Sequence, residues 1–379
     1  MSASRVRLLV IGVLVLALVA AAALFGVGWR YSAVLLDSPL PPDRNNLTVT
    51  AVTAGTVTLT ATPWTQRTGT FGLDWPGGTA VVSRIVGRPT SRTVTRAVRD
   101  RRGVLRPGTK AHLTNDVWDS DPRQARGLAF RTVRIAEPLG PTPAWYVAGS
   151  SRTWVLLVHG RGDTMSEGLR VMPALHRLGL PMLDISYRND PGAPAGPGRL
   201  YHLGGSEWRD VAAAVRYATA HGARHVVLYG WSMGGAIVEA FVRHSHLSSR
   251  VSAVVLDSPV VDWRAVLNLQ ANQRHLPGVV TWAAERVVSW RIGINWDDFD
   301  VVAHPQTITV PTLLFAGKSD TLVPYAPTAR LAAERPRLIT FYPVPTADHT
   351  EAWNIDPGAY DRRLAGFLRR HALPASAVG

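Results

Sequence analysis

The stretch "VVLYGWSMGGAIVEA" (Val226–Ala240) joins strand-forming residues to a helical pattern through a single serine between glycines. Its first residues favour a buried strand, and the run after Gly235 favours a helix. Gly230, Ser232 and Gly234 form G-x-S-x-G, the pattern of a nucleophile elbow. A serine on so sharp a turn adopts a strained backbone, so the residues two positions away on each side must lack a Cβ. The stretch predicts an exposed nucleophile, and a plain helix N-cap serine is the alternative interpretation.

Partners for such a serine occur later in the chain, after two further strand candidates. "TLLFAGKSDTLVP" supplies Asp320, and "FYPVPTADHTEAW" supplies His349. A serine nucleophile needs a histidine base and a carboxylate that orients the base, and this order of serine, acid and histidine suits an α/β-hydrolase. Asp257 is the rival acid and His371 the rival base. The neighbouring Asp348 is expected at the surface or in a supporting contact.

A further loop, within "WVLLVHGRGD" (Trp154–Asp163), follows the first parallel strand candidate. Two backbone amides are expected to hold a developing oxyanion, one from Met233 at the helix start and one from Arg161 in this loop. His159 precedes the serine and is expected to fix the loop by hydrogen bonding. Gly160 and Gly162 would let the backbone approach a substrate closely.

From about Phe130 to His371 the sequence resembles the serine α/β-hydrolase family. The resemblance rests on "HGRGD", "YGWSMGG", "GKSDTLVP" and "ADHT", and is closest to the lysophospholipase, monoglyceride lipase and prolyl-oligopeptidase-like branches. It implies an eight-stranded, mostly parallel sheet, with Ser232, His349 and Asp320 as the catalytic triad. It also implies that the amides of Met233 and Arg161 form the oxyanion hole.

The pattern after about Gly127 favours the same α/β class independently of that resemblance. Strand and helix candidates alternate, which indicates a doubly wound sheet. The alternation of strands and helices is interrupted at about 260–306, where helical sequence carries Trp263, Trp282, Trp290 and Trp296. This insertion between two core strands is predicted to be a helical cap.

The N-terminus carries an uncharged apolar run, Leu8–Trp29. It is long enough to cross a hydrocarbon core, which needs about 20 residues, and it predicts a transmembrane anchor. The alternative is a cleaved secretory signal ending near the small residues Ala20–Ala23. Arg5 and Arg7 precede the run and favour a cytoplasmic N-terminus, which places the catalytic unit outside the cytoplasm.

Between anchor and hydrolase lies a threonine-rich segment with period-2 alternation, Leu47–Thr62, which predicts two strands around Ala54-Gly55. Further strands are predicted at Thr79–Val86 and Ala111–Leu113. The expected organisation is an anchor at 1–30, a linker at 31–46, a small β-rich region at 47–124, a catalytic domain at 125–373 and a tail at 374–379.

Composition narrows the function classes. The formal net charge is +14, yet Lys110 and Lys318 are the only lysines and the arginines are scattered, which argues against nucleic-acid binding and allows attraction to an anionic surface. Cysteine is absent, so disulfides, zinc–thiolate sites and a cysteine nucleophile are excluded.

The sequence therefore predicts a membrane-anchored serine hydrolase that cleaves a carboxylic ester of a small, apolar acyl substrate without a metal or cofactor. A serine peptidase of the prolyl-oligopeptidase-like type is the alternative enzyme. A non-catalytic binding protein on a hydrolase fold is the alternative outside enzymes.

Overall fold

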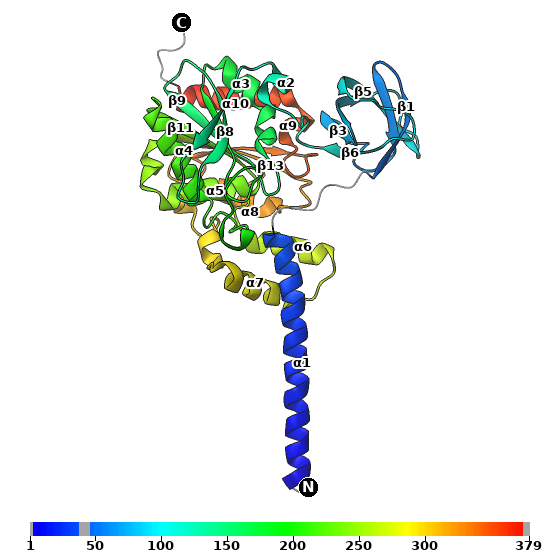
Figure 1. The fold of residues 1–379 in the computed structure, drawn as a ribbon, viewed down its shortest axis with the longest axis vertical. Helices are drawn as coiled ribbons and strands as arrows, with labels where there is room; N and C mark the ends of the chain where they lie inside the picture. Colours follow the sequence, from blue (N-terminus) through cyan, green and yellow to red (C-terminus); the bar gives the residue numbers. More distant parts are fainter. Residues whose placement is uncertain (1–2, 38–45, 374–379) are drawn as a thin grey trace.

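Eight strands form the central sheet of the catalytic domain (Figure 1), in the order β14-β13-β12-β11-β9-β10-β8-β7. The computed structural model describes residues 3–37 and 46–373. The strands are β7 (Arg131–Ile135), β8 (Thr142–Val147), β9 (Thr153–Val158), β10 (Met182–Ile185), β11 (His225–Trp231), β12 (Val251–Asp257), β13 (Thr312–Gly317) and β14 (Ile339–Val344). The six from β9 onward pair in parallel, whereas β7 and β8 pair antiparallel at one edge. The predicted mostly parallel α/β sheet is confirmed.

Helices cover both faces of this sheet, as expected for a doubly wound arrangement. They are α2 (Pro122–Arg126), α3 (Met172–Arg177), α4 (Trp208–Ala220), α5 (Met233–His244), α8 (Tyr325–Glu334), α9 (Ala352–Ile355) and α10 (Pro357–His371). Short 3₁₀ segments are η1 (Met165–Arg170), η2 (Pro197–Arg199), η3 (His246–Arg250), η4 (Trp296–Phe299) and η5 (Pro305–Thr307). Buried residues of α4, α5 and α8 share one hydrophobic core with the sheet, and those of α3 and α10 share the other. The segments η1 and α3 follow each other directly but are separate, because Pro173 favours a fresh helix start.

The chain order across the sheet determines where a site can form. After β9 the chain adds β10 on one side and then returns to add β11 on the other side of β9. Loops that leave the carboxyl ends of β9 and β11 therefore diverge, which opens a crevice between them. Both motif-bearing loops begin at this switch point.

Two helices, α6 (Trp263–Gln273) and α7 (Gly278–Ile292), fill the insertion between β12 and β13 and are here called the cap helices. Both lie on the side of the catalytic domain from which the N-terminal helix projects (Figure 1). Trp263 is buried and donates its indole N–H to the Leu203 carbonyl at 3.0 Å, so the cap is tied to the catalytic domain.

The N-terminal helix α1 (Ala3–Leu36) is continuous and contains one segment, Val6–Leu36, that is long and apolar enough to cross a membrane. It continues beyond the predicted anchor end at residue 30, so the first part of the predicted linker is helical. The remainder of that linker, 38–45, lies outside the described residues, as does the predicted tail. The end of α1 is part of the fold, because Leu35 and Leu36 are buried in the main core and Tyr201 donates its amide to the Leu36 carbonyl.

Ahead of the hydrolase sheet, six antiparallel strands close into a small barrel in the order β1-β2-β5-β4-β3-β6. They are β1 (Leu47–Val52), β2 (Thr56–Thr60), β3 (Phe71–Trp75), β4 (Gly78–Ile85), β5 (Thr93–Arg102) and β6 (Lys110–Thr114). Strands β3 and β5 were not predicted from the sequence. In β5 the inward-facing positions include Arg96, which breaks the apolar alternation that signals a strand.

Candidate active site

Ser232 lies on the turn between β11 and α5 with φ 49° and ψ −119°, a conformation that an L-residue adopts only under strain. A Cβ on Gly234 would overlap the carbonyl of Val158, and one on Gly230 would overlap the backbone of Gly234 itself. Only glycine fits at either position. The nucleophile elbow expected from G-x-S-x-G is thus present as a structure, with Met233 as the first residue of α5.

Ser232, His349 and Asp320 form one hydrogen-bonded row. His349 Nε2 lies 2.8 Å from Ser232 Oγ, and His349 Nδ1 lies 2.8 Å from Asp320 Oδ2. The second carboxylate oxygen of Asp320 accepts the amides of Leu322 and Val323, both at 2.8 Å, which fixes the carboxylate. These are the distances a base needs to take the serine proton while its other nitrogen is held.

The protonation behaviour of His349 follows from its surroundings. Burial disfavours the charged imidazolium, but the Asp320 carboxylate, with further contributions from Glu167 and Asp257, outweighs burial and raises the pKa of His349 above 6.5. A carboxylate at hydrogen-bond distance stabilises the imidazolium that forms when Ser232 loses its proton.

The rival residues lie elsewhere. Asp257 accepts hydrogen bonds from Tyr360 Oη and Ser258 Oγ, and burial raises the pKa of this carboxyl to about 6. His371 ends α10, where its ring packs 4.8 Å from that of Phe367. The structure therefore brings Asp320 and His349, not their rivals, to Ser232.

His159 sits at the start of the loop after β9, with both ring nitrogens engaged. Nδ1 lies 2.8 Å from the Gly160 carbonyl and Nε2 lies 2.8 Å from the Asp190 carboxylate. Burial alone would lower the pKa of His159, yet Asp190 raises it overall. Because a carbonyl oxygen can only accept, Nδ1 donates to it, and Nε2 is held by Asp190, so neither ring nitrogen is available as a base for Ser232. Its contacts fix the loop that carries Arg161 and the positive-φ Gly162.

A cluster of carboxyl groups lies directly behind this loop and was not anticipated from sequence. Glu167 accepts the Gly160 amide at 2.8 Å and pairs with the buried Arg170 at 2.8 Å. Ligand-type oxygens of Asp116, Asp163 and Glu167 lie within 4.8 Å of one another, a spacing that could hold a metal ion. Desolvation and the neighbouring carboxyls raise the pKa of Asp163 well above its usual value, and desolvation also raises the pKa of Asp116.

The barrel also reaches the site, through Arg67. Its guanidinium binds Asp348 and Glu351, each at 2.8 Å. The carboxylate of Asp348 in turn accepts the amides of Thr321 and His349 at 2.7 and 2.8 Å. Asp348 is therefore a supporting residue that joins the loop after Asp320 to the loop that carries His349.

Two more contacts hold this arrangement. Arg96 of the barrel donates to the carbonyls of Thr65, Arg67 and Gly69 and so fixes the loop that presents Arg67. Asn115, just after the barrel, donates to the His349 carbonyl at 2.8 Å. No local pattern in the sequence marks these residues, because each acts across more than two hundred positions or across the barrel.

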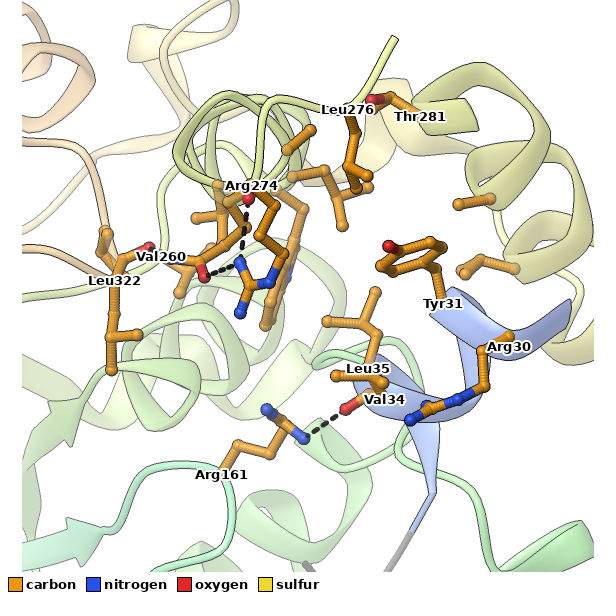
Figure 2. A pocket seen from close by; sticks show the side chains of 18 of the residues that line it. Arg30, Tyr31, Val34, Leu35, Arg161, Val260, Arg274, Leu276, Thr281 and Leu322 are labelled. Atoms are coloured by element: carbon orange, nitrogen blue, oxygen red, sulfur yellow. Dashed lines mark hydrogen bonds between the residues drawn. The ribbon is translucent and has the colours of Figure 1, made fainter. Parts of the chain in front are cut away.

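A cavity of about 1200 Å³ opens in front of the serine. Ser232, His349, Arg161 and Gly162 line one end, and most of the other lining residues belong to α1, α6 and α7. In Figure 2, Tyr31, Val34 and Leu35 form the α1 side of this cavity. The described lining of the cavity beyond the catalytic end is mostly apolar, which suits a hydrophobic group of a substrate.

Fold and crevice together define the catalytic domain as an α/β-hydrolase. Residues 200–339 match the family model described as the prolyl oligopeptidase family, so this part of the α/β-hydrolase fold is similar to that family. Residues 48–114, which span most of the barrel, match a model described as a domain of unknown function, DUF8805.

Individual proteins resemble this chain in sequence or in fold. An uncharacterized protein of Mycobacterium tuberculosis is 26% identical over 241 residues, which cover 62% of this chain and 75% of that protein. The uncharacterized protein YfhR of Escherichia coli O157:H7 is 22% identical over 265 residues, 66% of this chain and 83% of that protein. Among solved structures, the Pyrococcus furiosus esterase Pf2001 superposes with a TM-score of 0.54 at 18% identity, over 67% of this chain and 95% of that one. The last likeness supports the fold alone.

The raised pKa of His349 predicts how activity depends on pH. A base acts only when neutral, so kcat/KM for an ester should rise with pH through a value above 6.5. Asp320→Asn removes the carboxylate that raises this pKa, so the acid limb should move to lower pH and kcat should fall by roughly 10⁴. Asp100→Asn, at an exposed barrel position that pairs with Arg99, is the control. An acid limb that stays in place in the Asp320 variant would contradict the assignment.

The link through Arg67 predicts that the barrel supports catalysis at a distance. Arg67→Gln should leave the fold intact but loosen Asp348, so that the His349 loop is less well held and kcat falls by about 10-fold with little change in KM. Arg99→Gln on the same barrel, whose charge partner is exposed, should retain full kcat. Steady-state kinetics of both variants test this, and equal activities would show that Arg67 has no positioning role.

Proposed function

We propose that this protein is a membrane-anchored serine hydrolase that cleaves a carboxylic ester through an acyl-serine intermediate. The observation that carries the proposal is the row Ser232–His349–Asp320, placed at the polar end of a cavity with apolar walls. The α/β-hydrolase class of the fold is consistent with this chemistry.

The first half of the reaction forms the acyl-enzyme. His349 Nε2 takes the Ser232 proton as Oγ attacks the ester carbonyl, and the carbonyl oxygen becomes a tetrahedral oxyanion held by the amides of Met233 and Arg161. When the C–O bond to the leaving group breaks, His349 returns its proton to the departing alcohol. Asp320 holds Nδ1 throughout and stabilises the imidazolium.

The second half releases the acid. Water gives a proton to His349 and attacks the acyl-serine carbonyl, a second oxyanion forms in the same site, and collapse returns the proton to Ser232. Each oxyanion donor is worth about 10²–10³ in kcat, so the loop held by His159, Glu167 and Gly160 matters nearly as much as the row itself. These steps use side chains, two amides and water.

A serine peptidase is the second candidate, because residues 200–339 match the prolyl oligopeptidase family model. The same row of side chains could attack an amide. The apolar lining of the cavity favours the ester reaction, since an extended peptide brings polar backbone groups that would need partners there.

Membrane anchoring by α1 belongs to the proposal as well. The apolar run continues past Ala20–Ala23 through Phe25 and Val27, whereas the apolar region of a typical signal peptide has only about 7–15 residues, and this length favours a helix that stays with the mature protein. With Arg5 and Arg7 before the apolar run, the catalytic domain is placed outside the cytoplasm.

A substrate panel tests the reaction class. Purified full-length protein should hydrolyse p-nitrophenyl acyl esters and should not cleave aminoacyl-proline amides, and Ser232→Ala should lower kcat by about 10⁶. Activity confined to the amides would favour the peptidase. Failure of a fluorophosphonate probe to label folded protein at Ser232 would favour a non-catalytic binding protein.

Orientation can be tested in intact cells. Protease added outside should digest the catalytic domain if it lies beyond the cytoplasmic membrane, whereas a cytoplasmic marker protein should survive. Protection of the catalytic domain until the membrane is opened would place it on the other side.

A further inference from the structure

The cavity in front of Ser232 has an unusual wall, because one side of it is the apolar N-terminal helix. Ala23, Gly26, Val27, Tyr31 and Val34 of α1, together with the charged Arg30, line the same cavity as Ser232 and His349. The helix rises about 1.5 Å per residue, so this wall extends for roughly 16 Å from Ala23 to Val34. A helix that only tethered the enzyme would have no need to line its substrate cavity.

The contact between α1 and the cap is close and specific. A Cβ on Gly28 would meet the Ala283 carbonyl oxygen of α7 at 2.9 Å, so the two helix backbones approach as only glycine allows. At the C-terminal end of α1, Arg291 of α7 donates to Ser32 Oγ and to Asp37, both at 2.9 Å. This packing makes α1 a fixed wall of the cavity.

The helix also contacts the catalytic loop. Arg161, whose amide is the proposed oxyanion donor, directs its guanidinium to the Val34 carbonyl at 3.2 Å (Figure 2). That carbonyl lies in the last turn of α1, where carbonyl groups without helical partners attract a cation. The position of α1 is thereby coupled to the loop that would hold the oxyanion.

The position of each lining residue along α1 indicates how deep in a bilayer this wall of the cavity would lie. About 20 residues span the hydrocarbon core, and counted from Leu8 they reach Val27. Ala23 and Val27 would then lie at hydrocarbon depth, and Trp29 would lie at the interface, where tryptophan is enriched. The cavity that begins at Ser232 would therefore reach the boundary of the bilayer.

Exposed aromatic side chains of the cap helix α7 support the same placement of α1 in the bilayer. The ring of Trp290 lies 6.2 Å from that of Phe25 and 6.1 Å from that of Trp29. Trp282 and Trp290 of α7 are 53% and 69% exposed, on the helix that packs against α1. Large apolar groups exposed beside an apolar helix indicate contact with lipid.

Building on the proposed function, we propose that the substrate is a lipid of the membrane itself and that its acyl chain enters from the bilayer and lies along α1. The chain would occupy the apolar side, against Ala23, Val27 and Val280, with the ester carbonyl between Ser232 and Arg161. The anchor helix is then part of the substrate site and selects for acyl chain length.

The test narrows the cavity at the α1 residues that lie away from Ser232, in the full-length protein. Ala23→Trp and Val27→Trp place bulk in the cavity away from Ser232, whereas Ala22→Trp places it on an exposed position of the same helix turn outside the lining. The measured quantity is the ratio of kcat/KM for p-nitrophenyl palmitate to that for p-nitrophenyl butyrate in detergent micelles. The ratio should fall about 10-fold or more in the two cavity variants and stay constant in the control. An equal ratio in all three variants would overturn the proposal.

A binding measurement keeps this proposal separate from the reaction. If the wild-type protein cleaves neither ester, the proposed function fails, yet the cavity can still be probed in Ser232→Ala with a photoactivatable palmitic acid in vesicles. Crosslinks on peptides of α1 and α7, reduced by Val27→Trp and not by Ala22→Trp, would support the acyl site. Crosslinks that both variants leave unchanged would contradict it.

Discussion

The strained backbone of Ser232 is the constraint on which the rest of the site depends. A positive φ at a residue with a side chain is tolerated only where its surroundings impose it, and here the close approach of α5 to β9 does so. Without a Cβ at Gly234, the first turn of α5 can sit against the Val158 carbonyl, at the end of the neighbouring strand. The same approach that strains the serine brings the loop after β9 beside it.

With Ser232 exposed in the crevice, the loops that follow β9, β11, β13 and β14 meet around it. Each is held by contacts outside the regular sheet: Asp320 by two amides, His349 by Asp348 and Asn115, and the loop after β9 by His159 and Glu167. Some of this support comes from units added to the hydrolase fold. The barrel supplies Arg67, and the Val34 carbonyl in the N-terminal helix accepts a hydrogen bond from the Arg161 guanidinium. The barrel and the N-terminal helix therefore contribute contacts that support the site.

Much of this arrangement could be predicted from the sequence, and the exceptions have physical causes. Motifs at successive strand ends predicted that Ser232, Asp320 and His349 would meet, and they lie in one row, although their catalytic roles remain predictions. The alternating sheet was visible because buried parallel strands are continuous apolar runs. Strand β3 was missed although Phe71, Leu73 and Trp75 alternate along it, because it has only five residues and includes Gly72 and Asp74, residue types that are depleted in strands. The support from Arg67 and the contacts of α1 were missed because ion pairs and helix packing between distant segments leave no local signal.

The central claim is that Ser232 carries the acyl group, and trapping that intermediate tests it most directly. Full-length protein would be mixed with excess p-nitrophenyl ester, quenched in acid within the first turnovers, digested, and its peptides weighed by mass spectrometry. We expect the acyl mass to appear on the peptide containing Ser232 and Ser232→Ala to abolish it. An acyl group on another residue, or turnover without any acylated peptide, would contradict it.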